Sequence, residues 1–216
     1  MQILSAEQIR SWDRFTIEHT PISSIDLMER AAFAFCQKFQ SWYPEKNACL
    51  QIFCGPGNNG GDGLAVARIL HFAGYAVEVI ICEISDKKSL DFQLNLERLP
   101  KHDTIRVIHL QKEDDLSKLP KLPMVIDAIF GSGLNRPIQG YWAKLVYWIN
   151  EHTKQTVAID IPSGLFSDEV VGGPAIKANR TIGFQVPKLA YFLSENSIYI
   201  GKWAIVSIGL LSKFLI

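Results

Sequence analysis

The chain has 216 residues, of which 48% are hydrophobic and 20% charged, and its formal net charge is zero. This length fits one domain with a large hydrophobic core, and we take residues 1–216 as that single domain. The balanced charge offers no basic excess to nucleic acid or to an anionic membrane, and no apolar run approaches the ~20 residues that span a bilayer.

The amino terminus and the cysteines indicate the compartment. The first residues lack the basic start and the apolar centre of a signal peptide. Four cysteines stand in apolar surroundings without the spacing of a metal site: Cys36, Cys49, Cys54 and Cys82. Such cysteines are typical of buried thiols in a reducing compartment, so we expect a cytoplasmic protein.

Two amphipathic helices are predicted before the first strand. The first covers residues 5–19, with Ser5 as its N-cap and Gln8 as the capping-box partner. The second begins near Ser23 or Ser24 and runs to Trp42. Their apolar faces pack either on a sheet or on a second subunit, and we favour a homodimer.

Unbroken apolar runs then alternate with helical segments. The expected strands are 49–53, 76–82, 104–110, 123–130, 156–159, 180–184 and 203–208, and the expected helices between them are 60–72, 89–99 and 140–152. Continuous apolar strands are typical of a parallel sheet that helices cover on both faces. The pattern therefore predicts one doubly wound α/β domain.

A glycine-rich turn, residues 55–63, separates the first strand from the next helix. Five glycines in nine positions allow a sharp bend and let the backbone N–H groups face outward. The helix is expected to start at Gly60 or soon after, with its positive end toward the turn. A phosphate or another anionic oxygen is the natural ligand there, whereas a plain tight turn would not need Asn-Asn-Gly-Gly-Asp-Gly.

Part of this turn also fits the dinucleotide fingerprint G-x-G-x-x-G. Gly55, Gly57 and Gly60 supply the glycines, and Glu83 follows the next strand where a ribose-binding acid would lie. The match is weak by itself, because Asp62 and the two asparagines are unusual on a surface that only holds pyrophosphate. No Gly-Lys-Ser/Thr follows, which excludes the phosphate loop of the P-loop proteins.

Three motifs begin where a predicted strand ends: Gly55–Gly63, Asp127–Pro137 and Asp160–Gly164. In open parallel sheets ligands bind outside the carboxyl ends of the strands, so these motifs should converge in space. Taken singly, Asp127 or Asp160 is equally well explained as a turn former or a helix cap. Three such motifs at one edge favour a binding site.

The side chains of these motifs indicate the chemistry. Asn59, Asp127 and Ser163 offer hard oxygen ligands without sulfur or imidazole, which favours a monovalent ion or a partly hydrated magnesium over zinc. Asp160 stands at the base of the expected crevice, from which a carboxyl group could move protons. Arg136 either holds a phosphate or caps a helix.

With these residues laid out, the sequence resembles the NAD(P)HX epimerase family along nearly the whole chain. The matching pieces are Leu4-Ser5-Ala6-Glu7-Gln8 with Asp13, Leu27-Met28-Glu29-Arg30-Ala31, Gly55–Gly63, Asp127–Leu134, Asp160–Leu165, and Pro187-Lys188 before Gly201. The resemblance implies a Rossmann-like three-layer α/β/α sandwich with a mostly parallel, doubly wound sheet. It also implies an isomerase that interconverts the R and S epimers of hydrated NADH or NADPH, so that a dehydratase can restore the cofactor.

The resemblance further implies the roles of individual residues. Asn59, Asp127 and Ser163 would hold potassium (K⁺), and Asp160 would contact the reacting end of the substrate as general acid and then as base. The nucleotide-binding residues would be Asn58, Asn59, Gly60, Gly61, Asp62, Gly131, Ser132, Gly133, Leu134, Asn135, Arg136, Pro137 and Asp160. An ADP- or ATP-dependent dehydratase, fused or separate, would be the partner. After Leu165 the family often continues with Asp, whereas this chain has Phe166-Ser167-Asp168, so the loop over the site is expected to differ.

Two other functions compete with this one. Relatives of the domain in messenger-RNA decapping scaffolds keep the fold as a non-catalytic module for nucleotide sensing or dimerisation. Retention of Asn59, Asp127, Asp160 and Ser163 argues against a mere scaffold. An NAD-dependent oxidoreductase would use the G-x-G-x-x-G turn, but no Tyr-Lys pair or catalytic histidine stands near it. The choice between NADHX and NADPHX stays open.

Overall fold

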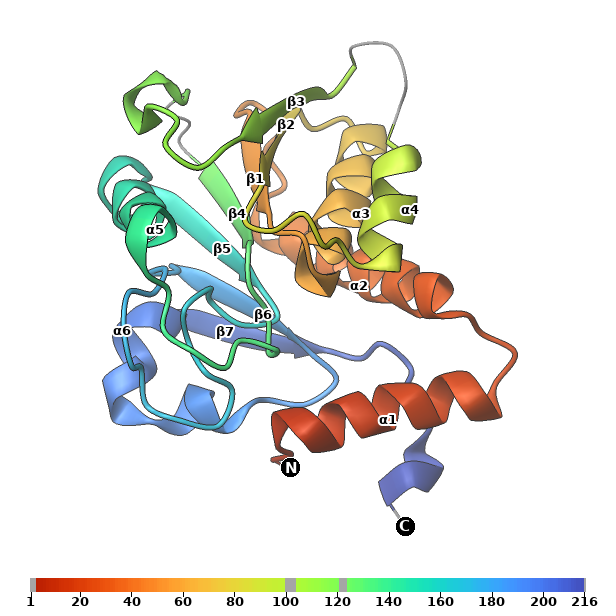
Figure 1. Cartoon of the computed structure of the whole chain (residues 1–216). Coiled ribbons are helices and arrows are strands. Elements are labelled where there is room, and N and C mark those ends of the chain that lie inside the picture. The colour runs from red at the N-terminus through yellow and green to blue at the C-terminus, as the bar shows by residue number, and fades with distance from the viewer. Residues whose placement is uncertain (1–2, 100–103, 121–123, 216) are drawn as a thin grey trace.

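The computed structural model describes residues 3–99, 104–120 and 124–215, built around a central sheet of seven parallel strands (Figure 1). The strands are β1 (Leu50–Cys54), β2 (Val77–Cys82), β3 (Arg106–Leu110), β4 (Met124–Ala128), β5 (Gln155–Ile159), β6 (Arg180–Phe184) and β7 (Lys202–Val206). Their order across the sheet is β3-β2-β1-β4-β5-β6-β7. The predicted α/β fold is confirmed, and the described sheet is parallel throughout.

Helices cover both faces of this sheet. They are α1 (Ala6–His19), α2 (Ser24–Trp42), α3 (Asn58–Phe72), α4 (Leu90–Glu97), α5 (Gly140–His152) and α6 (Ser197–Ile200), with short 3₁₀ turns η1 (Leu116–Lys118), η2 (Leu189–Phe192), η3 (Ser194–Asn196) and η4 (Ser212–Leu215). Figure 1 shows α2, α3 and α4 on one face and α5 and α6 on the other, which makes the three layers of a Rossmann-like sandwich.

Alternate residues of β1 and β2 pack into two different hydrophobic cores, one on each face of the sheet. On β1, Ile52 packs into the core under α2 and α3, whereas the next residue, Phe53, packs into the core under α5. All five residues of β1 and all six of β2 are buried. This two-sided burial explains why the strands are continuous apolar runs in the sequence.

Some element boundaries differ from the predictions, and hydrogen bonds explain two of them. The predicted strand 123–130 ends at Ala128, because Ile129 N donates to Asp127 Oδ1 and Phe130 N donates to Ser163 Oγ; its first residue lies outside the described residues. The last strand covers 202–206 instead of 203–208, since Ile208 N donates to the side chain of Gln185.

The amino-terminal helix α1 packs against the carboxyl-terminal segment of its own chain. It begins with the predicted capping box, in which both hydrogen bonds between Ser5 and Gln8 form. Trp12 is buried, donates from Nε1 to Leu211 O at 2.7 Å, and stacks on Phe214. A homodimer remains a prediction.

Within the described ranges, none of the helices is long and apolar enough to cross a membrane. The four cysteines are free thiols; Cys36, Cys54 and Cys82 are buried as predicted, while Cys49 is only half-buried.

Candidate active site

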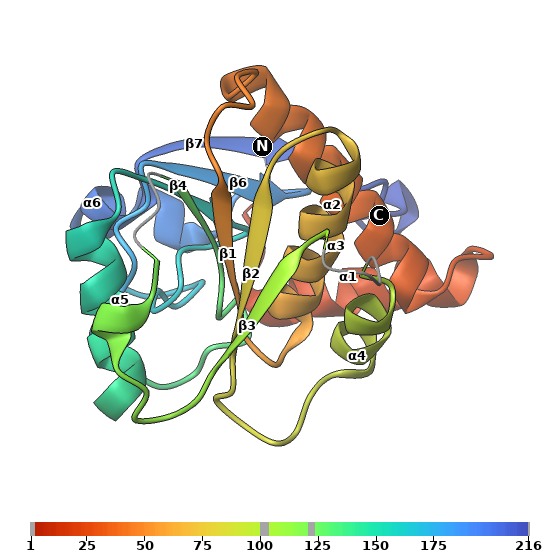
Figure 2. The same cartoon turned by 90° about the horizontal axis from the view of Figure 1, so that it is seen from above.

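The three predicted motifs follow β1, β4 and β5, which are neighbours in the sheet. From β1 the chain turns to β2 on one side, and β4 later pairs with β1 on the other side, as the view from above shows (Figure 2). This is a topological switch point, the place where open parallel sheets bind ligands at their carboxyl edge.

The glycine turn is shaped by two close backbone approaches. A Cβ atom at Gly60 would lie 1.7 Å from Gly55 O, and a Cβ atom at Gly55 would lie 1.9 Å from Ile129 O, so only glycine fits at either position. In contrast, nothing lies within 4 Å of a Cβ placed on Gly57. Helix α3 starts at Asn58, two residues earlier than predicted, and Gly57 caps it without a side-chain hydrogen bond. The first N–H groups of α3 are therefore suited to an anionic oxygen.

Asp127 and Ser163 fasten the end of β4 to the segment after β5. Asp127 is fully buried; its Oδ1 accepts from Ser163 Oγ at 2.6 Å and from Ile129 N at 3.2 Å, and its Oδ2 accepts from Ser163 N at 2.7 Å. Burial raises the pKa of Asp127 to about 6, while the hydrogen bonds from Ser163 and Ile129 act in the opposite direction. Two of the three predicted cation ligands are thus in direct contact.

Asn59, the third predicted ligand, lies against the segment that follows β4. A Cβ atom on Gly131 would lie 3.2 Å from Asn59 Cγ and 3.4 Å from its Oδ1, and the preceding residue, Phe130, is bonded to Ser163. Among the described residues, Asn59 Nδ2 is buried without a hydrogen-bond partner. A rotation of the amide would present its oxygen there instead. An unsatisfied buried amide near a carboxylate and a hydroxyl fits a hard cation of low charge.

Asp160 has a strained backbone that three contacts hold in place. Its φ of +63° lies in the left-handed region, at a cost on the order of 1 kcal/mol. Tyr191 on η2 donates its hydroxyl proton to Asp160 O, and Phe184 N donates to Oδ1 at 3.1 Å. Lys188, which is completely buried, forms an ion pair with the same Oδ1. The Asp160 carboxyl group, 13% exposed, is therefore fixed in direction beside a lysine.

Two more carboxyl groups interact with Asp160. Burial first, and then the charges of Asp160, Asp13 and Asp91, raise the pKa of Asp62 well above its ordinary value, while Lys188 lowers it. Burial and then the charge of Asp160 raise the pKa of Asp13 to about 6, again against Lys188. Asp62 comes from α3 and Asp13 from α1. Lys188 therefore pairs with Asp160 and also lowers the pKa of Asp13 and of Asp62 through its charge.

The loop of residues 131–137 forms the outer rim of the site. Gly131 contacts Asn59, as described, and Leu134 packs against the core under α5. Asn135, Arg136 and Pro137 are exposed. No hydrogen bond or ion pair of Arg136 occurs in the part of the chain that the structure describes, so it caps none of the described helices, and its phosphate role stays a prediction.

The sequence did not predict the roles of Lys188, Tyr191 and Asp13. Lys188 and Asp13 appear in the motifs of the resemblance, but nothing in their spacing says that they face Asp160. One signal was available: Lys188 precedes the mostly apolar run Leu189–Phe192, and a lysine in such a setting is buried only with a partner. The partner stands 28 positions earlier in the chain, and no local pattern connects the two.

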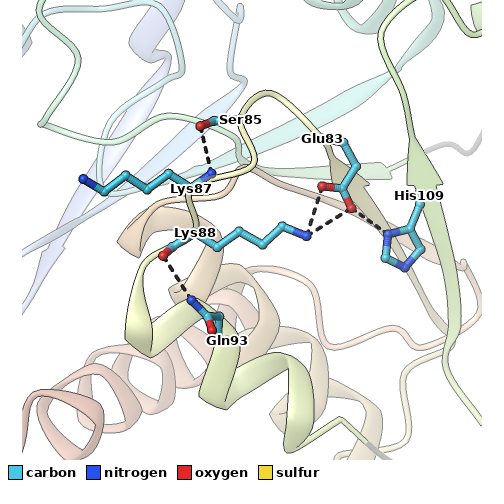
Figure 3. A network of polar contacts seen from close by, with 6 residues as sticks. All are labelled: Glu83, Ser85, Lys87, Lys88, Gln93 and His109. Carbon is cyan, nitrogen blue, oxygen red and sulfur yellow. Dashed lines mark hydrogen bonds and ion pairs between the residues drawn. The ribbon is translucent and has the colours of Figure 1, made fainter.

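Glu83 lies at the end of β2, where the dinucleotide fingerprint places its ribose-binding acid, but its carboxylate is already engaged (Figure 3). Lys88 Nζ lies 3.0 Å from one oxygen and 3.2 Å from the other, and His109 Nδ1 lies 2.7 Å from the second. Burial raises the pKa of Glu83, but the hydrogen bonds and charges of His109 and Lys88 outweigh it and lower the pKa. This arrangement gives the simple dinucleotide fingerprint no support.

Known proteins resemble the chain in sequence and in fold. Residues 24–190 match the family model described as YjeF-related protein N-terminus. The NAD(P)H-hydrate epimerase of Limosilactobacillus fermentum is 35% identical over 202 residues, which are 93% of this chain and 94% of that protein. The NAD(P)H-hydrate epimerase of Anaerococcus prevotii is 34% identical over 218 residues. The aligned region includes 99% of this chain and 97% of that protein.

Two further matches extend the comparison. The bifunctional NAD(P)H-hydrate repair enzyme Nnr of Salinibacter ruber is 34% identical. The aligned region includes 96% of this chain but only 41% of that longer protein. A crystal structure of the yeast protein ynu0 superposes with a TM-score of 0.78 at 23% identity, covering 96% of this chain and 88% of the yeast chain, and so shares the fold. The chain belongs to the family of the YjeF-related protein N-terminus, together with curated NAD(P)H-hydrate epimerases.

Proposed function

We propose that this protein is an NAD(P)H-hydrate epimerase, an isomerase of nicotinamide cofactor repair that interconverts the R and S forms of hydrated NADH and NADPH. Relatives that carry this name match the chain over nearly its full length. The observation that carries the proposal is the ion pair of Asp160 with the buried Lys188, together with the raised pKa values of Asp13 and Asp62 beside it, at the same sheet edge as the glycine turn.

The substrate is a dinucleotide with a pyrophosphate and a hydrated nicotinamide ring. The start of α3, from Asn58 to Asp62, and the rim loop from Gly131 to Pro137 bind the nucleotide. Support for this comes from the uncapped amino end of α3 and from the open space above Gly57 and Gly133.

Asn59, Asp127 and Ser163 would hold a potassium ion in this site. The support is the unsatisfied buried amide of Asn59 beside the bonded Asp127–Ser163 pair, as far as the described residues go. The preference for potassium over other hard cations comes from the family resemblance. When bound, the ion supplies a fixed positive charge that offsets nearby phosphate and carboxylate charges.

Asp160 moves a proton at C6 of the nicotinamide ring, where the two epimers differ. Its side chain is held in one direction by Phe184 N and Lys188, as proton transfer at a defined atom requires. A positioned carboxyl group contributes about 10²–10⁴-fold to such a reaction. A dimerisation or sensing module would have no use for this strained and charged arrangement.

We also propose partners and a location for the protein. A dehydratase that uses ADP or ATP would act on the product, either as a separate protein or in one chain, as the bifunctional name of the Salinibacter relative suggests. We expect a homodimer in the cytoplasm.

The direct test is incubation of purified protein with R-NADHX in potassium buffer, with the epimer ratio followed by chromatography. We expect the ratio to reach equilibrium far faster than without protein, and to do so more slowly when tetramethylammonium replaces potassium. An unchanged ratio would contradict the proposal. Hydride transfer, seen as a change at the reduced nicotinamide absorbance band, would support an oxidoreductase instead.

A further inference from the structure

Asp13 is the one acidic residue that α1 contributes to the neighbourhood of Asp160, and neither the fold nor the predicted site assigns it a task. Its Oδ1 is buried and, among the residues that the structure describes, has no hydrogen-bond partner. Burying an unpaired carboxylate is costly, so a group kept in this condition is better suited to carrying a proton than a charge.

The other half of the pair is Asp160, which lies against the buried Lys188. Its Oδ1 accepts hydrogen bonds from Lys188 Nζ and from Phe184 N. A carboxyl oxygen that faces two donors in this way is suited to the role of proton acceptor. The first step of the proposed reaction, departure of the C6 hydroxyl group as water, needs a donor.

We propose that Asp13 is this donor, and that Asp13 and Asp160 work as a two-carboxyl pair on opposite faces of the hydrated nicotinamide ring, with Lys188 holding Asp160 in place. The inference rests on the proposed epimerase function and adds a second proton-transfer group to it.

The bonds and protons of this step balance. The Asp13 carboxyl proton passes to the C6 hydroxyl oxygen, the C6–O bond breaks with its electron pair, and water leaves. The lone pair of the ring nitrogen forms the C6=N bond of an iminium ion. A water molecule then adds to C6 from the other face, the C=N pair returns to nitrogen, and the proton released by this water goes to Asp160. Exchange with solvent water then removes the proton from Asp160 and returns one to Asp13, which closes the cycle. In the reverse reaction the two carboxyl groups exchange roles, as an epimerase requires.

The pH dependence follows from the charges around Asp13. The charge of Asp160 raises the pKa of Asp13 and the charge of Lys188 lowers it, while the charge of Asp13 raises the pKa of Asp62. Asp168 accepts from Ala6 N at the start of α1, and Lys213 on η4 and two residues of α1 itself, Arg10 and Arg14, are exposed. The pKa of Asp13 is raised to about 6, so the proton needed for reaction is lost above that pH. The R-to-S and the S-to-R reactions each need one proton on the Asp13–Asp160 pair. We therefore expect the same dependence of rate on pH with R-NADHX and with S-NADHX as substrate.

The test measures kcat and KM for R-NADHX from pH 5 to 8.5 with the full chain and four variants: Asp13→Asn, Asp62→Asn, Asp160→Asn and, as the matched control on the exposed face of α1, Glu18→Gln. We expect kcat/KM of the wild type to fall about tenfold per pH unit above about pH 6. Asp13→Asn should lower kcat about 10²-fold or more with little change in KM, and should remove this fall. Glu18→Gln should behave as the wild type.

Three results would overturn the inference while leaving the epimerase function intact. They are wild-type activity that does not fall above pH 6, an Asp13→Asn variant that raises only KM, and a pH limb that disappears in Asp62→Asn instead. The wild-type profile does not depend on any variant's folding, and far-UV circular dichroism checks the variants. If the wild type shows no epimer exchange at any pH, the proposed function itself fails and the inference fails with it.

Discussion

The edge of the sheet at which the strands end has two halves, and different interactions hold their residues in place. In the β1–β4 half, Asp127 and Ser163 are joined by two hydrogen bonds, and the backbone of the glycine turn passes within contact distance of other backbone. In the β5–β6 half, Asp160 has a left-handed backbone and pairs with the buried Lys188, whose charge also acts on Asp13 from α1 and on Asp62 from α3. We call these the packed half and the charged half.

The difference shows how one edge can serve two purposes. The packed half fixes shape, because glycine positions and buried hydrogen bonds tolerate little change. In the charged half, burial and the charge of Asp160 raise the pKa of Asp13 to about 6, as a group that transfers protons near neutral pH requires. Changes in the packed half should therefore act mainly on stability, whereas changes in the charged half should act on pH dependence and rate as well as on stability.

The largest effect on stability is expected at Gly60. The Cβ atom of Gly60→Ala would lie 1.7 Å from Gly55 O, so the turn and the start of α3 must shift, and we expect a loss of about 3–5 kcal/mol. Urea unfolding measures it. Gly57→Ala in the same turn meets open space and should change stability by less than about 1 kcal/mol. Equal effects of the two substitutions would mean that the turn is not tightly packed.

The next effect is expected at Lys188. Lys188→Met keeps the length of the side chain but removes the cation from Asp160, and breaking a buried ion pair costs on the order of 3 kcal/mol. Lys202→Met, at an exposed lysine on β7, is the control and should stay within about 0.5 kcal/mol. A Lys188→Met variant as stable as the wild type at pH 7 would show that the charged half does not depend on its lysine.

A smaller effect, of opposite sign, is expected for Asp13. Its pKa is raised from 3.8 to about 6 by burial, so the folded state binds the proton more tightly than the unfolded chain does. That contribution to stability is fully present below pH 3.8 and is lost as the pH rises through 6. Asp13→Asn should therefore be more stable than the wild type by about 1–2 kcal/mol at pH 8, with this advantage absent at pH 4.

Thermal unfolding of both proteins at pH 4 and pH 8 measures this difference. A stability advantage that does not depend on pH would mean that Asp13 is not a buried titrating group. Glu18→Gln on the exposed side of α1 should show no comparable pH dependence.

The smallest effect is expected at Glu83, outside both halves. Its pKa is lowered by His109 and Lys88 against burial, so its contribution is present above the ordinary pKa of 4.5 and is lost as the pH falls below it. The pair with Lys88 is partly exposed, so Glu83→Gln should cost less than about 1 kcal/mol at pH 7 and even less in 1 M salt. A larger loss that salt does not reduce would contradict a solvent-screened pair.

The packed half could be predicted from the sequence, because its signals are local. Glycines at fixed spacing, the acids Asp127 and Asp160 at the ends of two apolar runs, and the parallel arrangement of continuous strands bring Asn59, Asp127 and Ser163 to one edge. The charged half could not be predicted in this way. Lys188 pairs with Asp160 although the two residues are 28 positions apart in the sequence. Asp13 lies near the site because α1 packs on Leu211 and Phe214, close to the other end of the chain. Such contacts depend on tertiary packing, which no spacing in the sequence encodes.

The central claim is that nucleotide binding and proton transfer occupy one crevice, with Asp160 serving the second. The most direct measurement compares Asp160→Asn with the wild type in two assays: the dissociation constant for NADPH by fluorescence titration, and the rate of R-to-S exchange. We predict a dissociation constant within about threefold of the wild type and an exchange rate lower by about 10²–10⁴-fold. Exchange at the wild-type rate, or equal losses of binding and exchange, would contradict the account.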